Sequence, residues 1–196
     1  MALSSDFSNY DNYYEAFFET YDKFIERNEN NYHLQLITIE ETFNVFSIID
    51  LEKEYIKNMI IEIGKTLGTE MYGLHYFMFT SIIKNICKFF WNVSLIKMIV
   101  SNNDYISESY EYKELAKDFE FIWDVMSNLC SKYDNKTNFK TTQEDYEIAC
   151  EMFFKLSQYT TTLLDIYKRK TKEHIARNTI IIRDESPNET HIIGKN

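Results

Sequence analysis

The most apolar stretch of the chain covers residues 72–100, and three lysines are its only charges. Polar side chains recur within it at spacings of three and four residues, at Ser81, Lys84, Asn85, Lys88 and Asn92. Residues at these spacings share one face of a helix, so the pattern predicts a buried central helix with one narrow polar stripe. Lys97 falls on the opposite side of a continuous helix. We therefore expect a break or kink near residues 92–94, with a second short helix up to Val100.

Periodic apolar positions predict amphipathic helices on both sides of this segment. They cover residues 8–28, 39–49, 51–66 and 112–132, and a long last helix over 141–177. Thr38 with Glu41, and Thr141 with Glu144, each have the spacing of a capping box, in which both side chains satisfy free backbone N–H groups. Asp50 either caps the helix over 51–66 or lies in a bend of one longer helix.

The remaining connections are predicted from polar clusters. Residues 101–104 and 134–138 are expected loops. The end of the chain is different, because residues 179–182 and 191–193 are short β-prone runs. Two short strands alone are marginal in water, so this part is either a hairpin or a disordered tail. We expect one helical domain over residues 1–177 and a C-terminal tail over 178–196.

Composition supports an all-α bundle of six or seven helices. The 196 residues include only 4 Gly and 1 Pro, and strand-rich folds need such turn residues every few positions. The length suits one domain with a substantial core. Richness in Asn, Ile, Lys, Tyr and Phe is what an A/T-rich genome encodes, which suggests a viral or mobile-element origin among other sources.

The charge balance bears on the partner. The formal net charge is −10, with 31 acidic and 21 basic residues. Direct binding to nucleic-acid phosphates is disfavoured, because that affinity comes from Lys and Arg. A protein partner with a basic surface is more plausible.

Cysteine usage and hydropathy point to the cytoplasm. Cys87, Cys130 and Cys150 are odd in number, widely spaced and placed on apolar faces, as expected for reduced core thiols. The N-terminal residues lack the features of a signal peptide. The longest uncharged run within the apolar stretch, over 71–83, is shorter than the roughly 18 residues that a membrane span needs. We expect an intracellular protein with no membrane association.

No pattern indicates a cofactor. The four histidines, His33, His75, His174 and His191, are scattered. None follows a glutamate at the spacing of di-iron bundles, and no His or Cys pair has zinc spacing. Four scattered glycines make no phosphate-binding loop. We expect neither a metal nor another cofactor, and an enzyme is the less favoured interpretation.

Acidic residues are the candidate binding site. The outer faces of the last two predicted helices carry Glu111, Glu114, Asp118, Asp124, Glu144, Glu147 and Glu151. Such a surface either keeps the protein soluble or docks on a basic partner. We expect a non-enzymatic interaction or regulatory protein that acts by binding another protein, with inhibition of that protein as one form of the regulation.

One short motif supports an alternative. Arg169 and His174 form an Arg-x4-His sequence, which resembles the motif of the HEPN ribonucleases. The resemblance implies a homodimer in which these residues of two protomers form one RNase site. A histidine supplies acid–base chemistry there and an arginine stabilises phosphate charge. The non-catalytic interpretation is that Arg169 and His174 are simply cations of the kind favoured near a helix C-terminus.

A second alternative comes from the layout. Amphipathic helices around a hydrophobic central helix resemble the arrangement of viral Bcl-2-like proteins, which implies a groove that binds a partner helix. The Asn-Trp-Gly-Arg signature of that family is absent, with Phe90-Trp91-Asn92 in its place, and the sequence has no apolar C-terminal anchor. No residue roles are carried over.

Overall fold

The computed structural model describes residues 38–66, 72–133 and 141–184, and within these ranges the protein is all-α and contains no strand. The helices are α2 (Ile39–Thr66), α3 (Tyr72–Ser101), α4 (Asp104–Ser107), α5 (Tyr110–Tyr133) and α6 (Gln143–Asp184). The all-α prediction is confirmed. The helix expected over residues 8–28 lies outside the described residues, so the number of six or seven helices stays a prediction.

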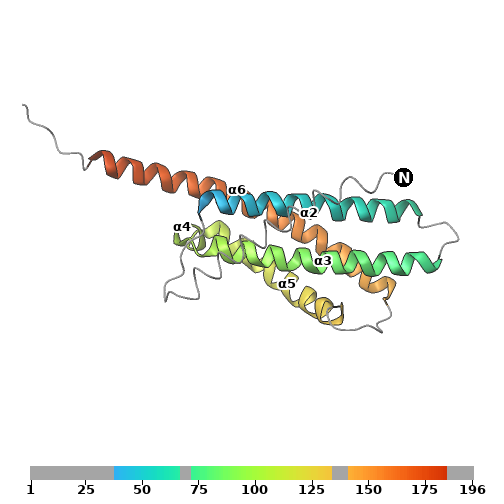
Figure 1. The fold of residues 1–196 in the computed structure, drawn as a ribbon. Coiled ribbons are helices and arrows are strands. Elements are labelled where there is room, and N and C mark those ends of the chain that lie inside the picture. Colours follow the sequence, from blue (N-terminus) through green and yellow to red (C-terminus); the bar gives the residue numbers. More distant parts are fainter. Residues whose placement is uncertain (1–37, 67–71, 134–140, 185–196) are drawn as a thin grey trace, which may run out of the picture.

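The four long helices run in alternating directions (Figure 1). α3 contacts α2, α4, α5 and α6, and α6 packs mainly on α3 and α5, whereas α2 and α6 touch only lightly. The 42 residues of α6 span about 63 Å at 1.5 Å per residue. Its C-terminal end therefore extends past the other helices, as the red end of the ribbon shows (Figure 1).

The core is built from the apolar face of α3 and the stripes that its neighbours turn towards it. Ile82, Ile86, Phe89 and Phe90 are fully buried. The Phe90 ring lies 6.2 Å from the Phe119 ring and 5.3 Å from the Trp123 ring of α5, measured between centroids. Burying each such side chain contributes about 1.5–3 kcal/mol to the hydrophobic free energy of folding. α3 is not completely enclosed, because Lys84, Lys88 and Met98 remain exposed.

The break predicted near residues 92–94, with a second short helix after it, is wrong, because α3 is one helix to Ser101. Asn92 was placed on the polar stripe, but it is buried, and its Nδ2 donates to both carboxyl oxygens of Glu52 in α2, at 2.7 and 2.9 Å. Lys97 needs no break either. It is half-buried with its Nζ 5.2 Å from the centroid of the Phe119 ring, where the ring face attracts the cation.

The start of α2 confirms the first capping box. Thr38 N donates to Glu41 Oε2 at 2.8 Å, and Glu41 N donates to Thr38 Oγ1 at 3.1 Å. α2 then continues through Asp50, which is exposed and pairs with Lys53 at 3.0 Å. The two helices expected over 39–49 and 51–66 are therefore one helix without an internal cap.

The capping box expected at the start of α6 is wrong by one residue. Thr142 Oγ1 accepts from Asp145 N at 3.1 Å, whereas Thr141 is buried and its hydroxyl meets that of Thr80 in α3. Asp145 also ties α6 to the end of α5, since it pairs with Lys132 at 2.9 Å and accepts from the Tyr133 hydroxyl at 3.2 Å. Burial raises the pKa of Tyr133 to about 12.

The last helix is longer than predicted. α6 continues to Asp184, so the β-prone residues 179–182 are helical. Helical hydrogen bonding propagated from a well-packed helix overrides a weak local strand preference. The rest of the expected tail, and the loop over 134–138, lie outside the described residues. The expected loop over 101–104 is shorter than predicted, because Ser101 ends α3 and Asp104 begins α4.

The cysteines have the predicted role. All three are free; Cys87 and Cys130 are buried and Cys150 is half-buried against the core. None of the helices in the described ranges combines the length and apolar character needed to cross a bilayer.

Candidate functional site

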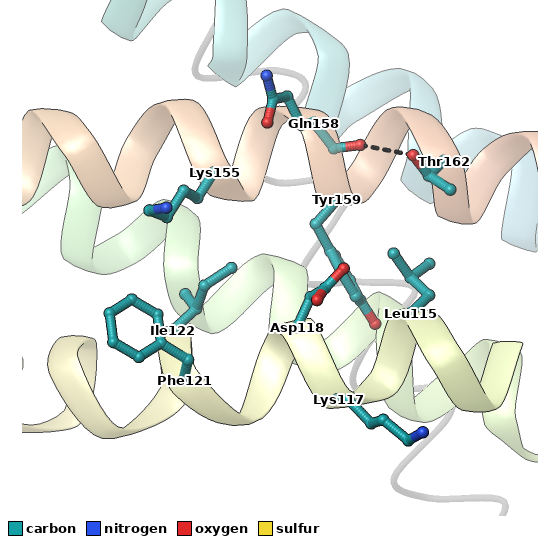
Figure 2. A pocket seen from close by; sticks show the side chains of 9 residues that line it. All are labelled: Leu115, Lys117, Asp118, Phe121, Ile122, Lys155, Gln158, Tyr159 and Thr162. Atoms are coloured by element: carbon teal, nitrogen blue, oxygen red, sulfur yellow. Dashed lines mark hydrogen bonds between the residues drawn. The ribbon is translucent and has the colours of Figure 1, made fainter.

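A groove of about 470 Å³ runs between α5 and α6. Figure 2 shows its lining, with α5 below and α6 above. The lining residues are Leu115, Lys117, Asp118, Phe121, Ile122, Lys155, Gln158, Tyr159 and Thr162. The two antiparallel helices pack through their buried apolar faces. The groove is the space between the side chains that flank those faces on α5 and α6. Its floor is apolar and its rim is charged.

Phe121 is the most prominent apolar side chain of the rim, with 56% of its surface exposed. Its ring lies 5.8 Å from Lys155 Nζ across the groove. Ile122, next to it on α5, and Leu115, further along the groove, are buried (Figure 2). An exposed phenylalanine above a buried apolar floor is what a partner's side chain needs for a contact that excludes water.

Tyr159 reaches from α6 towards α5 at the back of the groove (Figure 2). It is buried, and its hydroxyl has no hydrogen-bond partner among the described residues. Burial raises the pKa of this phenol, so it stays neutral. The centroid of the Phe119 ring lies 4.9 Å from that of Tyr159, which fixes the phenol against the core.

The charged residues of the groove differ in whether they have a partner within the protein. Lys117 pairs with Glu114 at 2.6 Å, and Lys155 pairs with Glu151 at 3.8 Å. The hydrogen bond and charge of Glu114 raise the pKa of Lys117. Asp118, in contrast, is exposed and makes no ion pair or hydrogen bond with any residue in the described ranges. It is therefore the carboxylate of the groove that is open to an external cation.

Glu111 is occupied within the protein. It lies 3.6 Å from Arg169 and 3.4 Å from Lys170, both on α6. A hydrogen bond from its own backbone lowers its pKa, and Lys170 and Arg169 lower it further. This pairing joins the start of α5 to the second half of α6. A basic partner that binds Glu111 would therefore have to compete with Arg169 and Lys170 for its carboxylate.

The other predicted acids lie apart from this pairing. Glu144 and Glu147 are exposed in the first turns of α6, and Glu147 accepts from Gln143 at 2.9 Å. Asp124 is exposed on α5 and does not line the groove. Lys117, Lys155 and Arg169 are interleaved with the acids. The seven predicted acids therefore lie on α5 and α6 without forming one uninterrupted acidic patch.

Arg169 and His174 do not meet within the chain. Both lie on the continuous α6, where residues five apart point about 140° away from each other. Arg169 pairs with Asp165 at 3.1 Å, whereas the His174 ring stacks on Tyr105 with centroids 4.1 Å apart. His174 Nε2 also lies 3.0 Å from Asn178 Nδ2. A ribonuclease site would need the same residues from a second copy.

The sequence interpretation missed a pair of tryptophans on the opposite side of α5. Trp91 of α3 and Trp123 are 44% and 41% exposed, and their rings meet edge to face at 5.7 Å. Trp91 follows Lys88 by three residues and so extends the exposed stripe, which is the signal that would have revealed it. Lys84 and Lys88 share this stripe, so this surface does not suit a basic partner.

The described residues contain no cluster of three or more His, Cys, Asp or Glu side chains that could hold a metal ion. Comparisons of the sequence with protein-family models and curated proteins, and of the fold with solved structures, found no match.

Proposed function

We propose that this protein is a non-enzymatic, cytoplasmic interaction protein that regulates another protein by binding it through the groove between α5 and α6. The partner presents a short amphipathic helix whose apolar side chains enter the groove and whose lysine or arginine reaches Asp118. The observation that carries the proposal is Phe121, half-exposed above a buried apolar floor and next to that unpaired carboxylate.

Geometry supports a helical ligand. The groove lies between two antiparallel helices, and Leu115, Asp118 and Ile122 recur along α5 at spacings of three and four residues. A partner helix laid along α5 would present side chains at the same spacing. This is also the feature that the resemblance to groove-binding bundles implied.

Electrostatics supports a basic ligand. The chain carries a net charge of −10, and Glu144 and Glu147 add exposed negative charge on α6. Charges of this kind raise the rate of encounter with a basic partner, and the contact at Asp118 then fixes its orientation. The affinity is expected to fall as salt is added, because exposed charges are screened.

A capture experiment tests the proposal. Immobilised wild-type protein and the Phe121→Ser and Asp118→Lys variants are exposed to extract of the native host, and the recovered proteins are quantified by mass spectrometry. Each substitution is expected to lower the recovery of the same basic partner roughly ten-fold, the typical effect of removing an interface anchor.

Two controls accompany the variants. Tyr110→Ser removes an exposed aromatic residue from α5 outside the groove, and Asp124→Lys makes the same charge change as Asp118→Lys on another face. Both are expected to retain the partner. Equal recovery by all five proteins would contradict the proposal, as would a loss confined to the control variants.

A further inference from the structure

Exposed side chains form a continuous row along α6, at alternating spacings of four and three residues. The row, called the α6 row below, begins at Glu147 and Glu151, passes Phe154 and Thr161, and reaches Ile175. A spacing that averages 3.5 residues is the repeat with which one helix packs along another. The row lies on the side of α6 that faces away from the core. Among the described helices α2 runs along its edge, where Lys53 Nζ donates to Thr161 Oγ1 at 3.4 Å.

Charge is separated along the α6 row. Glu147 and Glu151 lie on the N-terminal side of Thr161, and Lys168 and Lys172 lie on the C-terminal side. Asp165 also belongs to the C-terminal side of the row, where Arg169 of the same helix pairs with it at 3.1 Å. Neither Lys168 nor Lys172 makes an ion pair with a residue in the described ranges. A helix face that is acidic in one half and basic in the other is complementary to itself when two copies run antiparallel.

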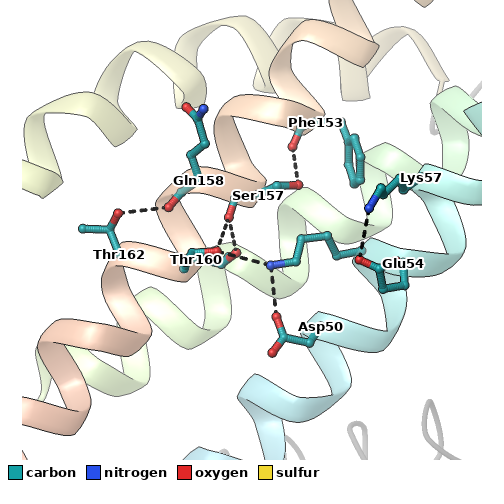
Figure 3. A network of polar contacts seen from close by, with 10 residues as sticks. Asp50, Glu54, Lys57, Phe153, Ser157, Gln158, Thr160 and Thr162 are labelled. Carbon is teal, nitrogen blue, oxygen red and sulfur yellow. Dashed lines mark hydrogen bonds and ion pairs between the residues drawn. The ribbon is translucent and has the colours of Figure 1, made fainter.

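The centre of the row at Thr161 is uncharged but lies against an ion pair of α2, because Lys53 Nζ donates to Thr161 Oγ1 at 3.4 Å and pairs with Asp50 at 3.0 Å. Figure 3 shows this region, where the hydroxyls of Ser157, Thr160 and Thr162 donate to carbonyl oxygens of α6 itself, at 2.8 to 3.1 Å. These groups have internal partners and carry no charge. Lys53 keeps its partner Asp50, so two helices can approach at this point without leaving that charge unpaired.

Apolar contact area lies on both sides of the centre. Phe154 is 52% exposed and borders a hollow of about 550 Å³ between α6 and Lys53 of α2. Ile175 is 49% exposed and borders a second hollow, of about 270 Å³, against Ile39 and Phe43. The second hollow lies where α6 passes the start of α2, so both hollows follow the loosely packed seam between α2 and α6.

We propose that the α6 row binds the α6 row of a second copy of this chain, antiparallel, with the two-fold axis next to Thr161. Residues at roughly equal distances from the axis then face each other. Glu151 meets Lys172 of the second copy, and Phe154 meets Lys168, each contact occurring twice. The first is an ion pair and the second places a cation against an aromatic ring.

The symmetry follows from the charge order. A two-fold interface uses the same surface on both subunits. A parallel pairing would place Glu151 against Glu151 and Lys172 against Lys172, which repels. Most contacts in the antiparallel pairing are charged and exposed, so the dimer is expected to weaken as salt is added. This inference does not rest on the proposed function, because neither the contact of Glu151 with Lys172 nor that of Phe154 with Lys168 involves a residue that lines the groove between α5 and α6. Gln158 of the row borders both surfaces.

Sedimentation velocity of the full chain at low salt, over a range of concentrations, tests the pairing. Glu151→Lys and Lys172→Glu each create two like-charge contacts, so each variant alone is expected to dissociate roughly ten-fold more readily or worse. An equimolar mixture of the two variants is expected to restore the dimer. In the mixed dimer both contacts again join opposite charges, because the two variants reverse opposite ends of the same ion pair.

The control is Glu62→Lys on α2, which makes the same charge change away from the row and is expected to dimerise as the wild type does. Circular dichroism of each variant verifies its helical content. A wild-type chain that sediments as a monomer at every concentration overturns the inference. So does a mixture that stays monomeric, or a dimer that both single variants leave intact.

Discussion

Replacing Phe90 with alanine is expected to lower the free energy of unfolding by about 3–5 kcal/mol, the usual cost of removing a buried ring. Phe90 is fully buried, and its ring lies close to those of Phe119 and Trp123 on α5. The substitution would open a cavity at the contact between α3 and α5. Urea unfolding followed by circular dichroism measures the change.

The matched control for Phe90→Ala is Phe121→Ala, which removes the same side chain where 56% of it is exposed. Exposed substitutions usually change stability by less than about 0.5 kcal/mol. Similar losses for the two variants would contradict the placement of Phe90 in the core and of Phe121 on the rim of the groove.

Replacing Asn92 with alanine is expected to cost about 1–3 kcal/mol, the range for a buried polar group that loses its hydrogen-bond partner. Asn92 Nδ2 donates to both carboxyl oxygens of Glu52, and both residues are buried. The substitution takes this donor away from a carboxyl group that water cannot reach. The same urea titration measures the loss.

A double-mutant cycle separates this contact from general damage to the core. In a Glu52→Ala background, Asn92→Ala is expected to cost at least about 1 kcal/mol less, because the carboxyl group is already gone. Asn85→Ala is the control, since its amide donates to Ser81 O of the same helix and should cost the same in both backgrounds. Strict additivity for Asn92 would rule out the buried contact.

These two sites show where prediction from sequence succeeded and where it stopped. The apolar spacing on either side of Phe90 was sufficient to predict a helix with a buried face, because burial of that face depends on local periodicity. Asn92 was assigned to an exposed stripe, because its partner Glu52 lies forty residues earlier and no local pattern pairs them. Lys97 was likewise read as a break, although Phe119 accommodates it.

The helix ends likewise show that contacts within one turn were predicted and contacts between helices were not. Thr38 and Glu41 cap α2 as predicted, since both partners of that contact lie within one turn. At α6 the competing threonines were adjacent, and the burial of Thr141 against Thr80 decided which one caps the helix. The continuation of α6 through residues 179–182 depends on the helix that precedes them rather than on their own preference.

The sequence predicted some residues of the candidate site but not how they are arranged. The sequence identified acidic residues on the last two helices, but the groove depends on how α5 and α6 meet. That contact decides that Glu111 pairs with Arg169 and Lys170, whereas Asp118 stays open. Phe121 and Phe154 are exposed, and no sequence pattern singled them out as contact residues.

The two proposed surfaces give α6 two tasks, and they meet at Gln158 and Thr162, which line both the groove and the hollow next to Phe154. Its edge towards α5 forms one wall of the partner groove, and the α6 row forms the contact between copies. A dimer would therefore present two grooves, which allows a partner with two binding segments to bind more tightly than one with a single segment.

Hydroxyl-radical footprinting of the protein, with and without its captured partner, tests the central proposal most directly, because it reports the exposure of individual aromatic side chains. Binding in the groove predicts that labelling of Phe121 falls strongly while labelling of Trp91 and Trp123 is unchanged. Protection of the two tryptophans with undiminished labelling of Phe121 would show that the partner binds elsewhere and would contradict the account.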